Sequence, residues 1–80
     1  MTKIECKKCE KLMYEAMLKA NVAQEEYNES EKHLKDGNEL EWEVAQRKAD
    51  RHYGEAVGIK QALATLGFKH ERMKELSKLI

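Results

Sequence analysis

Small and apolar residues recur at alternating steps of three and four along two long segments of this 80-residue chain. The first series consists of Cys6, Cys9, Met13, Ala16, Ala20, Ala23, Tyr27, Ser30 and Leu34. The second series consists of Trp42, Ala45, Ala49, His52, Ala56, Ile59, Leu63 and Leu66. This spacing places each series on one face of an α-helix and is typical of helices that pack along a shared seam. Six of the positions are alanine, so the two helix backbones can approach closely.

A single short turn separates the two series. Gly37 can adopt the left-handed conformation that ends a helix, and Asn38 followed by Glu41 has the spacing of a capping box. The chain contains no proline to interrupt either helix. We therefore predict one all-α domain over residues 1–80, an antiparallel hairpin of helices 8–36 and 39–66. Gly67 is expected to end or bend the second helix before a short last helix near 69–79.

The seam also predicts which residues meet across the hairpin. Antiparallel pairing about the turn places Tyr27 opposite His52, which we interpret as a histidine whose hydrogen bonds are satisfied in the interior. The three-four spacing continues beyond Gly67. If the helix continued in register there, His70 would face Cys9.

Cys6 and Cys9 are the only cysteines, and their spacing leaves three interpretations open. Two thiols on one helical face, with His70 opposite, could hold a zinc ion, although a fourth ligand is not evident. Free cysteines also pack as small apolar residues. A redox pair is the third interpretation, but such a motif normally follows a strand, and none is predicted.

A second apolar surface lies outside the seam. It is predicted to include Tyr14, Met17, Leu18 and Val22 on the first helix, and Tyr53, Gly54, Val57 and Gly58 on the second. Each glycine in a helix interior costs about 1 kcal/mol relative to alanine, which suggests that something approaches closely there. An alanine-rich hairpin also buries few large side chains. We therefore expect this surface to mediate homodimerisation into a four-helix bundle.

Charge is separated along the chain although the net charge is zero. Residues 25–43 contain eight acidic and two basic residues, whereas residues 1–19 and 69–80 together contain nine basic and five acidic ones. A folded hairpin would therefore have an acidic turn end and a mildly basic open end. The balanced total gives no reason to expect binding to nucleic acid or to a membrane.

No arrangement of residues typical of catalysis is evident, and no glycine-rich phosphate loop is present. We expect a non-enzymatic interaction module, such as an adaptor, an inhibitor or an assembly factor, that acts as a homodimer on another protein. One alternative is a binding module stapled by zinc at Cys6, Cys9 and His70. A second is a small-ligand-binding protein with a pocket near Gly54 and Gly58. The small number of cysteines and the lack of an export signal favour a cytoplasmic location.

Overall fold

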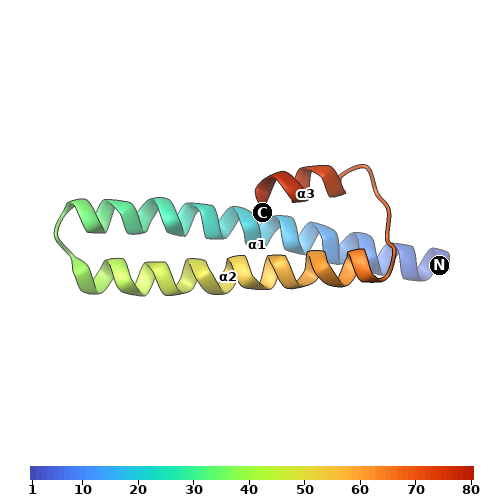
Figure 1. Cartoon of the computed structure of the whole chain (residues 1–80), viewed down its shortest axis with the longest axis horizontal. Helices are drawn as coiled ribbons and strands as arrows, with labels where there is room; N and C mark the ends of the chain where they lie inside the picture. Colours follow the sequence, from blue (N-terminus) through green and yellow to red (C-terminus); the bar gives the residue numbers. More distant parts are fainter.

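The chain forms two long antiparallel helices and one short helix. The computed structural model describes all 80 residues and contains α1 (Lys3–Lys35), α2 (Glu39–Thr65) and α3 (Met73–Leu79), with no strands. α1 and α2 pack along their length, and α3 returns along α1 at the open end of the hairpin (Figure 1). The molecule is an elongated rod of 52 × 17 × 16 Å. The predicted all-α hairpin with a short C-terminal helix is confirmed.

α1 begins five residues earlier than the sequence analysis predicted. Thr2 is the N-cap, and its side-chain oxygen accepts a hydrogen bond of 3.2 Å from the backbone N–H of Glu5. The Thr2 hydroxyl also donates to the Glu5 carboxylate at 3.0 Å. Thr2 and Glu5 have the spacing of a capping box, a sequence signal for this earlier start.

Gly37 ends α1 as predicted, with φ +78°. The N–H of Asn38 donates to the carbonyl of His33, and the N–H of Gly37 donates to that of Leu34. These two bonds satisfy carbonyls at the end of the helix in a Schellman motif. Asn38 precedes α2, but its side chain makes no capping hydrogen bond. The predicted capping box is therefore wrong: Glu41 instead contacts His33 across the turn at 3.1 Å.

Gly67 ends α2 with the same Schellman motif. Its φ is +74°, and the N–H of Phe68 donates to the carbonyl of Leu63. The left-handed residue turns the chain out of the helix, so the seam does not continue in register to His70. Instead, residues 68–72 reverse direction and α3 runs back along α1 (Figure 1).

The apolar core is concentrated at the open end. Its buried members are Cys9, Met13, Ala16, Leu63, Phe68 and Leu76. Towards the turn, the buried positions of the two long helices are small: Ala20, Ala23, Ser30, Ala49 and Ala56. Phe68 and Leu76 do not belong to the predicted seam. They are buried because the reversal after Gly67 packs the C-terminal segment against α1 and α2 from the side.

Leu76 provides a direct test of this packing. Its side chain is fully buried, whereas Leu79 on the same helix is 39 % exposed. Leu76→Ala should lower the free energy of unfolding by about 2–5 kcal/mol, because a buried leucine leaves a cavity. Leu79→Ala should cost much less. Urea unfolding followed by circular dichroism measures both, and equal losses would show that α3 is not docked as described.

Candidate interaction surfaces

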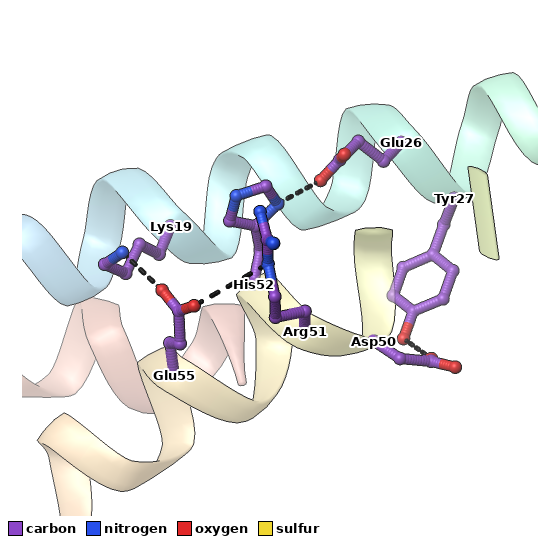
Figure 2. Close-up of polar contacts among 7 residues, drawn as sticks. All are labelled: Lys19, Glu26, Tyr27, Asp50, Arg51, His52 and Glu55. Carbon is purple, nitrogen blue, oxygen red and sulfur yellow. Dashed lines mark hydrogen bonds and ion pairs between the residues drawn. The ribbon is translucent and has the colours of Figure 1, made fainter. Parts of the chain in front are cut away.

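Polar contacts join α1 and α2 along the middle of the hairpin, where the seam residues are small (Figure 2). Glu55 of α2 forms an ion pair with Lys19 of α1 and lies 3.8 Å from Arg51 in its own helix. One turn nearer the hairpin turn, Nδ1 of His52 lies 2.5 Å from the Glu26 carboxylate. These contacts hold the two helices in register without large apolar side chains.

Tyr27 and His52, which were predicted to lie opposite each other, have different polar partners on the facing helix. Tyr27 instead donates a hydrogen bond of 2.5 Å from its hydroxyl to Asp50 (Figure 2). Nearer the turn, the buried Ser30 hydroxyl donates to the carbonyl of Tyr27 at 2.7 Å and lies 3.0 Å from the side-chain oxygen of Gln46. Every buried side-chain nitrogen or oxygen has a hydrogen-bond partner, so the interior polar groups are satisfied.

Each of the three histidines contacts a glutamate on another element. His52 contacts Glu26 as described above, and Nε2 of His70 lies 3.7 Å from Glu10. The side chain of His33 is only 27 % exposed beside Glu41. The histidines therefore serve as contacts between elements.

The C-terminal segment covers one side of the predicted dimer surface. The Arg72 guanidinium lies 5.1 Å from the centre of the Tyr14 ring, and the Tyr53 hydroxyl donates to the carbonyl of Ile80 at 3.0 Å. Met17 packs against the core cluster. Val57 is half-buried. Tyr14, Met17 and Tyr53 are thus engaged within the chain, a role that the sequence analysis did not foresee.

The other predicted interface residues are not engaged in this way. Leu18 is 64 % exposed, and Val22 is half-buried. Gly54 and Gly58 are exposed, and a Cβ added at either would meet no atom within 4 Å. Nothing within the chain therefore requires glycine at these two positions.

A shallow groove follows the junction of α1 and α2 on the side away from α3. Tyr14 contacts the C-terminal segment. Lys19 follows it by five residues, and at 100° per residue the two side chains lie roughly 140° apart around α1. The groove near Lys19 has a volume of about 540 Å³ and is lined by Leu12, Glu15, Lys19, Glu55, Gly58, Ile59 and Ala62. Gly58 thus lies on a face that α3 leaves open.

The same face continues to the turn end of the hairpin. From Gly58, the positions of Glu55, Arg51, Lys48 and Val44 follow at steps of three and four, which keeps them on one side of α2. A second groove of about 340 Å³ lies there, lined by Glu26, Glu29, His33, Leu40, Glu41, Val44, Ala45 and Lys48. We call it the turn-end groove.

The turn-end groove combines exposed apolar side chains with carboxylates. Leu40 is 76 % exposed and Val44 is 47 % exposed, and three glutamates line the groove beside them. The sequence analysis identified the negative charge of this end but not these apolar residues. Leu40 and Val44 are four residues apart and lie outside the seam, and this spacing in the sequence indicates a second apolar face on the helix.

The three residues of the predicted zinc site differ in burial and in their contacts. Cys9 is buried in the apolar core, while Cys6 is exposed. The His70 ring stacks on Phe68 with 5.9 Å between ring centres, and its Nδ1 accepts a hydrogen bond from the N–H of Arg72. No group of three or more histidine, cysteine, aspartate or glutamate side chains is arranged to hold a metal ion. Zinc binding stays a prediction, which elemental analysis and melting with a chelator would test.

Comparison with protein-family models, with curated proteins and with solved structures finds no match to this chain. Neither long helix has a stretch apolar enough to span a membrane.

The hydrogen bond from Tyr27 to Asp50 predicts a measurable titration. Chiefly through this bond, with contributions from burial and the Asp50 charge, the pKa of Tyr27 is raised from 10.0 to about 12. The folded state retains this proton more tightly than the unfolded chain. The resulting stability is present in full below pH about 10 and is lost as the pH rises through about 12.

Phenolate absorbance measured against pH should show one late-titrating tyrosine. Asp50→Ala should lower its pKa towards 10, because the variant removes both the hydrogen bond and the charge. Tyr27→Phe should abolish the late transition, and Tyr14→Phe should leave it in place. A late transition that survives in Tyr27→Phe would contradict the assignment.

Proposed function

We propose that this protein is a non-enzymatic interaction module that acts as a homodimer and presents helix faces to another protein. The main support is the amount of apolar surface that the folded chain leaves in contact with water. Eleven large hydrophobic side chains are exposed, and Leu18, Leu40 and Ile4 are each more than 60 % exposed. Exposed apolar surface on a small domain is typical of sites that bind other proteins.

The distribution of the core supports association as well. The buried side chains of appreciable size are gathered at the open end, while the half nearer the turn is held mainly by alanines and exposed or half-buried polar contacts. Surface ion pairs contribute only about 0–1 kcal/mol each. Packing against a second copy would bury more apolar surface along this half and would stabilise the hairpin.

Homodimerisation is tested at Leu18. The wild-type protein should be a dimer at micromolar concentration by sedimentation equilibrium. Leu18→Glu should raise the dissociation constant at least about tenfold, because the carboxylate must lose hydration where the 64 % exposed Leu18 side chain would be buried. Leu79→Glu introduces the same charge on α3 instead of α1 and should leave the dimer intact. A folded monomer for the wild-type protein would overturn the proposal.

Action on another protein is tested with the same variants. A partner captured from the host by the wild-type protein should be retained by Leu79→Glu and lost by Leu18→Glu, because the proposed active form is the dimer. A partner held equally by all three proteins would show that dimerisation is not needed for binding. Turnover of a small molecule by the purified protein would contradict the non-enzymatic assignment.

A further inference from the structure

One stripe of α1 carries opposite charges in its two halves. At steps of three or four, on the side away from α3, the stripe contains Ile4, Lys8, Lys11, Glu15, Lys19, Val22, Glu26, Glu29 and His33. This spacing follows one face of a helix. The half near the open end carries Lys8 and Lys11, and the half near the turn carries Glu26 and Glu29. When a second copy of the stripe lies antiparallel to the first, the lysines of each copy face the glutamates of the other.

Several charges of this stripe have no partner within the chain. Lys8, Lys11 and Glu29 form no ion pair, whereas Lys19, Glu26 and His33 of the same stripe already contact charged or titratable groups of α2. The apolar residues at its two ends are similarly uncovered. Ile4 at the open end is 69 % exposed, and Leu40 beside the turn-end groove is 76 % exposed, the two largest exposures among the large hydrophobic residues.

We infer that a second copy of this chain occupies this face, with its α1 antiparallel to α1 of the first and a two-fold axis near Leu18 and Lys19. The inference rests on the homodimer proposed above and specifies its geometry. Reversal about these residues places Lys8 opposite Glu29 of the second copy and Lys11 opposite its Glu26. Because the axis is two-fold, each contact occurs twice.

The same geometry supplies an occupant for the turn-end groove. Reversal brings Ile4 of one copy beside His33 of the other, and His33 is one of the residues that line the groove. The exposed Ile4 side chain would then lie near Leu40 and Val44, while lysines of the same helix meet the glutamates of the groove. Apolar contact and charge complementarity thus coincide at both ends of the dimer.

The length of α1 matches this arrangement. α1 runs from Lys3 to Lys35, so its midpoint is Lys19 and the reversed helices overlap along their whole length of roughly 50 Å. The Lys19–Glu55 ion pair shows that this midpoint lies beside the part of α2 that contains Gly58. Since a Cβ at Gly58 would meet no atom of its own chain within 4 Å, the glycine leaves room for a close approach by the second copy.

Charge also argues against the other two-fold arrangement of two such hairpins. With the axis parallel to the helices, the two turn ends would lie side by side. Each carries eight acidic and two basic residues within 25–43, so like charges would be brought together. Antiparallel stacking separates the two turn ends and places each against a basic open end.

Charge reversal tests the pairing of residues 8 and 29. Lys8→Glu and Glu29→Lys should each weaken the dimer about tenfold, because two attractive pairs become repulsive in each case. The double variant restores both pairs with their signs exchanged and should recover most of the affinity. An equimolar mixture of the two single variants should likewise form a heterodimer in preference to either homodimer. Lys78→Glu on α3 serves as the control and should leave the affinity unchanged.

Crosslinking tests the position of the axis. In a Cys6→Ser, Cys9→Ala background, a cysteine introduced by Leu18→Cys should form a disulfide-linked dimer under mild oxidation, because the axis places the residue near its own copy. Cysteine at position 8 alone should not crosslink, whereas the pair Lys8→Cys and Glu29→Cys on separate chains should. Strong crosslinking at position 8 alone would overturn the antiparallel geometry.

The two proposals fail in different ways. A wild-type protein that is monomeric would remove the homodimer and the geometry together. A dimer that dissociates with Leu18→Glu, but whose affinity is the same in Lys8→Glu, Glu29→Lys and the double variant, would retain the proposed function and overturn the antiparallel pairing. A dimer stable to all four changes would place the interface on another face.

Discussion

The close approach of two helices along an alanine seam is the constraint on which the other features of this structure depend. Ala20, Ala23, Ala49 and Ala56 are buried between α1 and α2, but each contributes little apolar area. The hairpin therefore needs stabilisation from elsewhere, and it obtains this differently at its two ends. At the open end, Phe68 and Leu76 fold back to complete an apolar core. Towards the turn, hydrogen bonds and ion pairs such as His52 with Glu26 hold the register but leave apolar side chains exposed.

The periodicity of the sequence was sufficient to predict the two long helices and their antiparallel packing, because a three-four pattern of small residues has few other solutions. The helix end at Gly37 was also predicted, because a glycine in the left-handed conformation commonly ends a helix. Gly67 has the same φ sign and the same hydrogen-bond pattern. The end or bend of the second helix at Gly67 was predicted, but the apolar spacing that continues past it left open whether the seam keeps its register. The periodic pattern does not reveal that the backbone has left the helix, so the burial of Leu76 could not be obtained from it.

The surface residues illustrate a related limit. Tyr14 and Leu18 are one turn apart on α1, and sequence spacing groups them into one stripe. The structure separates them: Tyr14 contacts Arg72 and His70, while Leu18 faces solvent. Which side of a hairpin is covered by a third helix depends on the direction in which the connecting segment reverses. That direction is set by the conformation of residues 67–72, which no periodic pattern encodes. The role of the two cysteines could not be decided from the sequence for the same reason. The position of His70 relative to them depends on the conformation of residues 67–72.

A balanced net charge conceals how strongly this chain is polarised along its axis. Eight of the fifteen acidic residues lie within 25–43, at one end of a rod 52 Å long, with only two basic residues among them. Beyond about 10 Å, salt screens most of the attraction between exposed charges, so the basic open end of the same chain cannot neutralise them. Neutralisation requires a basic surface held directly against the turn end. A reversed copy of the same α1 stripe provides one, with Lys8 and Lys11 spaced to meet Glu29 and Glu26. The charge pattern that leaves each hairpin polarised is therefore also the pattern that makes two hairpins complementary.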